Sequence, residues 1–317
     1  MQCLNNRYFC RDLLSHKPNF MKLITKYWNE KPLTFILFLA FAVRLVSVIF
    51  SKGYGMHDDH FLVIEAAKSW ADGFDYNNWL PVEGQAAPTP SGHSFFYAGL
   101  HYFLFCFLKF IGIPDPQGEM VVIRLLHALL SLLTVYCGYK IALKTAGEKI
   151  AKTVGLLLAV FWFMPFMSVR NLVEFVCIIP LMVATWLVVK NEDQNRITTY
   201  IWAGLLLGIA FSIRFQTVMF TGGFGLALLF LKRFKEAVVL GVTFLIVAAS
   251  VQGITDFYIW GKPFVEFQEY VRYNIAYAHE YLVQQWYMYI LLILGVLVPP
   301  LSIFLFWGFL RSWKKHL

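Results

Sequence analysis

Two acidic residues between two histidines are the first group in the chain with evident chemical potential. The run His57-Asp58-Asp59-His60 follows the apolar segment 32–51 within ten residues. A partly desolvated carboxylate at a membrane rim can remove the proton of an acceptor hydroxyl. One aspartate before a helix also serves as an N-cap, but two adjacent carboxylates exceed what a cap requires. Asp59 and Asp58 are therefore the candidate catalytic bases.

The same four residues are ligand types that metals accept, so a metal site is the main alternative. Four consecutive side chains cannot all turn toward one ion, and no second ligand cluster is evident in the sequence. The five cysteines are odd in number and lack a CxxC spacing, so they indicate neither zinc nor a disulfide framework. We expect no cofactor, and a divalent metal is the less favoured alternative.

Ionisable residues inside or beside apolar runs are costly in a membrane and indicate function unless they snorkel or pair. Arginine at such a position suits a phosphate, because a guanidinium binds phosphate oxygens bidentately. An ion pair between Arg170 and Glu174 is the structural alternative. The ionisable candidates for substrate binding are Arg124, Arg170, Glu174, Arg214 and Asp256, and Gln216 joins them as a polar residue in the short turn beside Arg214.

Two polar segments, residues 52–119 and 256–285, contribute the other candidates. In the second, aromatic rings beside carboxylates and amides suit a sugar, although interfacial anchoring also explains such rings. In the first, the pattern predicts a helix from Asp59 to Asp72 with Glu65 paired to Lys68. Its expected apolar face comprises Phe61, Leu62, Ala66, Trp70 and Ala71. The candidate substrate-binding residues of the two segments are His57, His60, Glu65, His93, Arg272 and Asn274.

Membrane helices must position these residues. The chain of 317 residues is 59% hydrophobic and only 15% charged, with a mean hydropathy of +0.60, which excludes an ordinary soluble domain. We expect an all-α integral membrane protein with about eight transmembrane helices. Because two of them are short, we expect a recessed turn near Arg214. The predicted spans are 32–51, 120–143, 150–168, 172–189, 199–213, 215–231, 236–255 and 286–310.

The net charge of +8 describes orientation rather than a nucleic-acid partner. If segment 95–113, rich in Phe and Tyr, lies in the interface, the inside carries 18 basic and 6 acidic residues and the remainder carries 9 and 13. The positive-inside rule favours this layout. It predicts a cytoplasmic segment 1–31, a membrane module 32–310 with external loops 52–119 and 256–285, and a cytoplasmic tail 311–317.

Four stretches together resemble the GT-C polytopic glycosyltransferases, especially the dolichyl-phosphate-mannose type mannosyltransferases of families 22 and 39. They are HDDHF, GHSFFYAGLHY with RLLHALLSLL, GLLLGIAFSIRFQT, and TDFYIWGKPFVEFQEYVRYN. The resemblance implies a GT-C bundle with juxtamembrane helices in the large first external loop, and Asp58 or Asp59 as the base. It also implies that Arg214, Arg170 and Arg272 contact a lipid phosphate, while Asp256 and Asn274 shape the site. His60 stands where a second acid is usual.

The activity implied by this resemblance is transfer of a sugar, mannose or another hexose, from a polyprenyl-phosphate donor. The acceptor would be a lipid, glycan or protein on the outer face of the membrane. That face is the periplasm in a bacterium or the lumen of the endoplasmic reticulum in a eukaryote. A transporter or flippase that binds the substrate without chemistry is the alternative. The chain shows no internal repeat and its acids lie at the rim, which favours an enzyme.

Overall fold

The computed structural model describes residues 17–53, 59–82, 84, 88–194, 196–280 and 283–316, so His57 and Asp58 lie outside the described residues. Within these ranges the regular elements are helices, in agreement with the predicted class. Four helical segments are long and apolar enough to cross a membrane. The chain is therefore an integral, multi-pass membrane protein. These segments are α3 (Pro32–Phe50), α7 (Pro116–Ala146), α10 with α11 (Val173–Lys190) and α14 through α15 (Phe234–Trp260).

Eight full spans are not established by the described helices. Three other apolar helices are shorter than a span: α6 (Phe95–Phe110), α12 (Ile197–Ile213) and α13 (Thr217–Phe230). The predicted span 150–168 is interrupted, because α8 (Glu148–Val160) ends where Phe161 takes an extended backbone. The short α9 (Met164–Met167) then follows.

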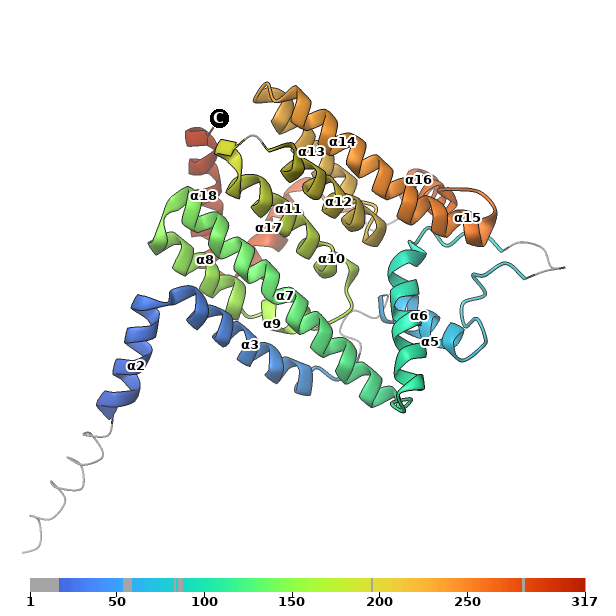
Figure 1. Ribbon diagram of the computed structural model, residues 1–317, viewed down its shortest axis with the longest axis horizontal. Helices are drawn as coiled ribbons and strands as arrows, with labels where there is room; N and C mark the ends of the chain where they lie inside the picture. Colours follow the sequence, from blue (N-terminus) through green and yellow to red (C-terminus); the bar gives the residue numbers. More distant parts are fainter. Residues whose placement is uncertain are drawn as a thin grey trace, which may run out of the picture. The chain divides into compact units, whose positions relative to one another are not determined.

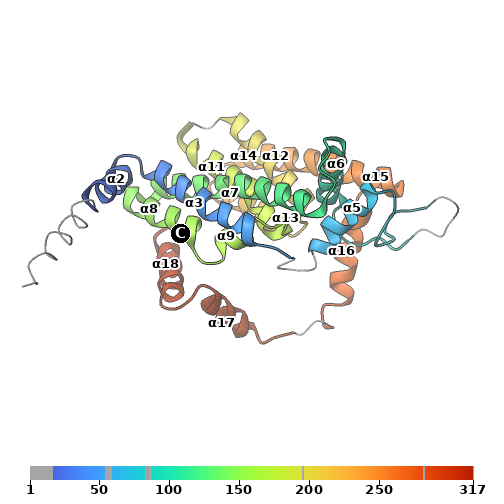
Figure 2. The same ribbon diagram turned by 90° about the horizontal axis from the view of Figure 1, so that it is seen from below.

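The helices up to Phe267 form one compact unit. In it α14 packs on α12, α12 on α11, α11 on α7, and α7 on both α3 and α8 (Figures 1 and 2). Two glycines of α12 permit its close approach to α14. A Cβ at Gly204 would lie 2.6 Å from the Leu240 carbonyl oxygen, and one at Gly208 would lie 2.6 Å from Val247 Cβ. The glycine-rich stretch is therefore a helix-packing surface.

The long helix α3 carries a fully buried arginine, Arg44. Its guanidinium donates to the carbonyl oxygens of Leu158 and Ala159, each at 3.1 Å, and its Nε donates to Ser131 Oγ at 2.7 Å. The last carbonyls of a helix have no partner within that helix. Arg44 therefore caps the end of α8 from a neighbouring helix.

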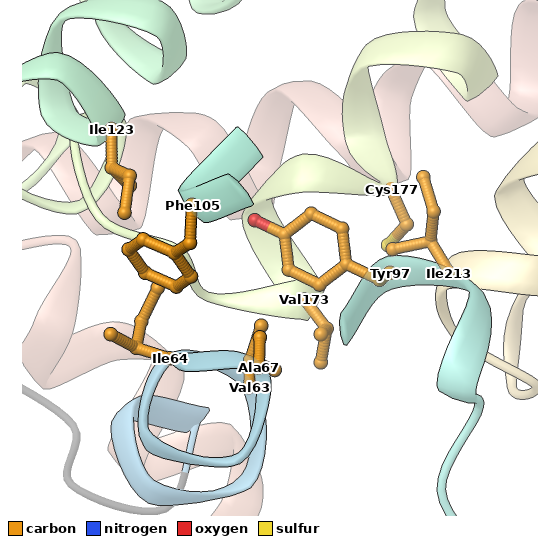
Figure 3. Close-up of a cluster of buried hydrophobic side chains, with 9 residues drawn as sticks. All are labelled: Val63, Ile64, Ala67, Tyr97, Phe105, Ile123, Val173, Cys177 and Ile213. Carbon is orange, nitrogen blue, oxygen red and sulfur yellow. The ribbon is translucent and has the colours of Figure 1, made fainter. Parts of the chain in front are cut away.

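The predicted juxtamembrane helix is present, but its buried face differs from the expectation. It consists of a π-helical turn, η1 (His60–Glu65), followed by α5 (Ala66–Ala71), and it packs against α6 at one end of the long helices (Figure 1). Val63, Ile64 and Ala67 join a buried cluster with Tyr97 and Phe105 (Figure 3). The wider π-helical turn changes the period on which the expected face was based.

The expected pairing of Glu65 with Lys68 is wrong. Glu65 lies 3.1 Å from His60 Nε2, and Lys68 Nζ lies 2.8 Å from Glu119 of α7. Glu119 is 2% exposed. A buried carboxylate needs a cationic partner more than a solvated one does, so Lys68 pairs with Glu119 rather than with Glu65.

The second compact unit, Gln268–Leu317, contains most of α16 (Val265–Ala276) and the helices α17 (Trp286–Val296) and α18 (Leu301–His316). A bend of 120° separates α17 from α18 around Pro299 and Pro300. Proline lacks the N–H that a continuing helix needs. The predicted span 286–310 is therefore not one straight helix.

Candidate active site

Asp59 sits at the start of η1, but its carboxylate serves another helix. No side-chain bond from Asp59 caps η1, so the N-cap interpretation is wrong for its own helix. Instead Asp59 Oδ2 accepts the backbone N–H of Val173, the first residue of α10 (Val173–Val176), at 3.0 Å. The Asn171 side chain donates to the Asp59 carbonyl oxygen at 2.8 Å. Residues 171–173 therefore fix both the backbone and the carboxylate of Asp59.

Glu174 brings a second carboxylate and an arginine to Asp59. The Glu174 carboxyl is hydrogen-bonded to that of Asp59, and its Oε1 lies 2.8 Å from Arg214 Nη2. Arg214 occupies the turn between α12 and α13. The expected pair of Arg170 with Glu174 is wrong, because Arg170 instead donates to the Gly53 carbonyl oxygen at 2.7 Å. Three distant parts of the chain thus meet at Asp59.

Burial gives Asp59 the proton affinity of a base that works near neutral pH. Desolvation is the largest cause, and the negative charge of Glu174 and its hydrogen bond act in the same direction. Together they raise the pKa of Asp59 to about 7, although the Val173 N–H and Arg214 oppose the rise. A general base is most effective when its pKa lies near the operating pH.

Two further arginines lie behind this group. Arg124 Nη1 donates to the Ser51 carbonyl oxygen at 2.7 Å, and Arg170 donates to Gly53, so both hold the segment that leads to the HDDH run. Burial, and next the charge of Arg124, lower the pKa of Arg170. Arg170 also stacks over Phe166 at 4.2 Å, and its buried Nε has no hydrogen-bond partner among the described residues. Arg170 can therefore donate to a ligand.

An apolar cavity of about 560 Å³ opens between α6, α7, α11 and α12. Its size is typical of small-molecule sites, which range from about 300 to 1,000 Å³. Of its lining residues, Ile213 is adjacent to Arg214 in the chain and Val176 is two positions from Glu174. The Tyr97 hydroxyl, hydrogen-bonded to His127, is a polar group in its wall. The walls of this groove are therefore formed by these helices.

A second acidic group lies apart from the first and is closed to solvent. Glu266 Oε2 accepts from the backbone N–H of Gly92 at 2.6 Å and from Ser91 Oγ at 3.0 Å. Asp256 accepts from the backbone N–H of Glu266 at 3.1 Å and from the Gln252 side chain at 2.8 Å. Both carboxylates are 0% exposed, and burial raises the pKa of Glu266 to about 7. This group ties segment 52–119 to segment 256–285.

The other candidates are not joined to Asp59 by any described contact. His60 is bonded to Glu65, and His93 is exposed with its ring 6.0 Å from that of Trp79. Gln216 is exposed at the start of α13. In the second unit Arg272 binds Glu269 through two nitrogens, at 2.6 and 2.7 Å, and Asn274 donates to the Tyr270 carbonyl oxygen.

The sequence profile of the Alg9-like mannosyltransferase family matches residues 34–317, most of the chain. The chain belongs to this family. Its members are GT-C polytopic glycosyltransferases, so the protein is a membrane-bound mannosyltransferase that uses a lipid-linked donor. The resemblance seen in the sequence is thereby confirmed. A comparison with curated proteins finds no match.

Sequence reasoning missed several residues that build this candidate site or the second acidic group. Asn171 and Val173 hold Asp59, and their only signal was proximity to Arg170 and Glu174. Glu266 was visible only as one acid among aromatic residues. The signal that could have singled it out is its position between Val265 and Phe267, where a carboxylate faces a cost of burial.

Proposed function

We propose that this mannosyltransferase transfers mannose from a polyprenyl-phosphate donor to a lipid, glycan or protein acceptor on the outer face of the membrane, with Asp59 as the general base. The carboxylate of Asp59, fixed at the start of α10 where Glu174 binds Arg214, carries this proposal. The basic inside and acidic outside of the sequence support an outward site, in a periplasm or in the lumen of the endoplasmic reticulum.

The groove and the arginines suit different parts of the donor. The polyprenyl chain suits the groove, whose walls are almost entirely apolar side chains of α6, α7, α11 and α12. The phosphate suits Arg170 and Arg214, because Arg170 Nε is an unused buried donor and Arg214 is one-third exposed. The anomeric carbon then lies between the phosphate and Asp59, where an acceptor hydroxyl can approach.

The chemistry follows from that arrangement. The acceptor hydroxyl loses its proton to the Asp59 carboxylate as its oxygen forms a bond to the anomeric carbon. The bond between that carbon and the phosphate oxygen breaks, and its electron pair leaves with the phosphate. The arginines stabilise the charge that develops on the leaving oxygen. Attack opposite the leaving group inverts the anomeric carbon.

The test uses membranes that contain the full chain and polyprenyl-phosphate mannose with a radiolabelled sugar. We expect label to move from the donor to acceptors in those membranes, and Asp59→Asn to abolish this movement. Asp72→Asn is the matched control, since Asp72 ends the same juxtamembrane helix but pairs only with lysines in the described contacts. Asp58→Asn reports separately on its neighbour. Full activity of Asp59→Asn would refute the base assignment, and label that stays on the lipid would favour transport.

A further inference from the structure

We propose that Glu174 is the second acid of this site: it accepts from Asp59 the proton that Asp59 takes from the acceptor, and passes it to water. This role rests on the proposed function of Asp59 as the base. Glu174 does not touch the reacting atoms, so it acts as a positioning and proton-exchange residue.

The backbone places the two carboxyl groups together. Asp59 caps the N–H of Val173, and Glu174 is the next residue along α10. Arg214 holds Glu174 from the other side at 2.8 Å. The Glu174 side chain is 53% exposed, whereas Asp59 is half-buried. The pair thus has one more buried member, Asp59, and one more exposed to water, Glu174.

His60 does not supply a second acid. It follows Asp59 directly in the sequence, but its Nε2 is directed to Glu65 at 3.1 Å. A carboxylate 115 positions away, Glu174, instead contacts Asp59. The fold therefore places a second carboxyl group beside Asp59, although the next residue in the sequence is a histidine.

Several charged and polar groups face Asp59 and determine whether its negative charge is favoured or opposed. They are Glu174 from α10, Arg214 from the turn after α12, and the Tyr97 hydroxyl from α6, with His127 of α7 behind it. His127 Nδ1 faces the Ile123 carbonyl oxygen at 2.7 Å, so its Nε2 accepts from Tyr97. Glu174 is therefore the facing group that opposes the negative charge on Asp59, and Arg214 favours it.

The proton balance of one turnover is complete with these residues. The proton of the acceptor hydroxyl bonds to an Asp59 oxygen, and the O–H electron pair forms the new bond to the anomeric carbon. The phosphate leaves with the electron pair of the broken bond. Asp59 then transfers the proton to Glu174, whose exposed carboxylate releases it to water, and the pair returns to its starting charge.

The pH dependence of transfer tests this role. Membranes carrying the wild-type chain, Glu174→Gln, Glu174→Asp or Glu148→Gln receive radiolabelled polyprenyl-phosphate mannose from pH 5 to 9. Wild-type transfer should rise with pH through about 7. In Glu174→Gln this rise should move to lower pH by about one unit, with roughly tenfold slower maximal transfer. Glu174→Asp should restore the wild-type profile in part. Glu148→Gln, which removes an exposed carboxylate paired with Lys152, should behave as wild type.

Three results would overturn the role of Glu174. The first is a Glu174→Gln profile with the wild-type midpoint. The second is an equal shift in Glu148→Gln. The third is a raised KM for the donor with an unmoved midpoint, which would assign Glu174 to substrate binding. Activity of Asp59→Asn is a separate outcome: it would refute the base assignment, whereas an inactive Asp59→Asn with an unshifted Glu174→Gln refutes the proton-exchange role alone.

Discussion

Two pairs of neighbouring acids on different elements stand out among the described residues, and they differ in what surrounds them. Asp59 and Glu174 lie beside an arginine, and Glu174 is 53% exposed to water. Asp256 and Glu266 are fully enclosed and receive backbone N–H and side-chain donors. The pKa values of Asp59 and Glu266 nevertheless rise to the same value, about 7. A raised pKa therefore marks burial, and access to a substrate must be shown separately.

The enclosed pair is a structural joint. Glu266, in the first turn of α16, holds the backbone at Gly92, and the same loop is held again where Ser94 Oγ meets Gln252 Oε1 at 2.6 Å. Ser94 also starts α6 by accepting the N–H of Phe96. The joint fixes the start of α6, and α6 forms one wall of the groove.

The largest expected difference between the pairs is in catalysis. Asp59→Asn should lower transfer by roughly 10²–10⁴-fold, the contribution typical of a general base. Glu266→Gln, matched in charge and shape change, should keep transfer within a few-fold per folded molecule. Initial rates with radiolabelled donor, normalised to folded protein, measure both. Equal losses of transfer activity in the two variants would contradict the view that only the Asp59–Glu174 pair takes part in catalysis.

The reverse order is expected for stability. Glu266→Ala leaves the Gly92 N–H and the Ser91 hydroxyl buried without their acceptor, which should cost roughly 2–3 kcal/mol. Asp59→Asn should cost less, because the site has access to water. Thermal unfolding in detergent measures both. A melting temperature of Glu266→Ala equal to that of the wild type would show that the hydrogen bonds of Glu266 do not stabilise the protein.

The pH dependence of stability should also separate the pairs. The pKa of Glu266 is raised from 4.5 to about 7 by burial, so the folded protein binds more protons than the unfolded chain between these values. Its contribution is therefore full below pH 4.5 and is lost as the pH rises through 7. We expect Glu266→Gln to flatten this part of the curve of melting temperature against pH. A curve parallel to that of the wild type would contradict it.

The smallest expected effect is that of Ser91→Ala. It removes one of the hydrogen bonds to Glu266 and should lower the free energy of unfolding by about 1 kcal/mol without changing transfer. Combined with Glu266→Gln, the two changes should be less than additive, since they share one interaction. Strict additivity in thermal unfolding would show that Ser91 acts independently of Glu266.

Much of the framework could be predicted from the sequence because apolar runs and their length are local properties. The bounds of α3, of α10 with α11, and of α12 match the expected spans within a few residues. The contacts between distant residues could not be predicted in this way. Glu174 bonds to Arg214 rather than Arg170, and Lys68 to Glu119 rather than Glu65, because the partner is selected by packing. The end of α8 was missed for the same reason, since its cap comes from Arg44.

Arg44 also bears on the order in which the chain is synthesised. It emerges with α3, yet its partners Ser131, Leu158 and Ala159 are made between 87 and 115 residues later. Until then its charge stands in the first membrane helix alone, at a cost of about 2.5–3.5 kcal/mol on insertion scales. The apolar residues of α3 keep its mean hydropathy at 2.5 even with Arg44 included, and they must hold the helix in the bilayer during this delay. The apolar residues of α3 therefore serve two purposes: they pack against neighbouring helices, and they offset the charge of Arg44 until α8 has been made.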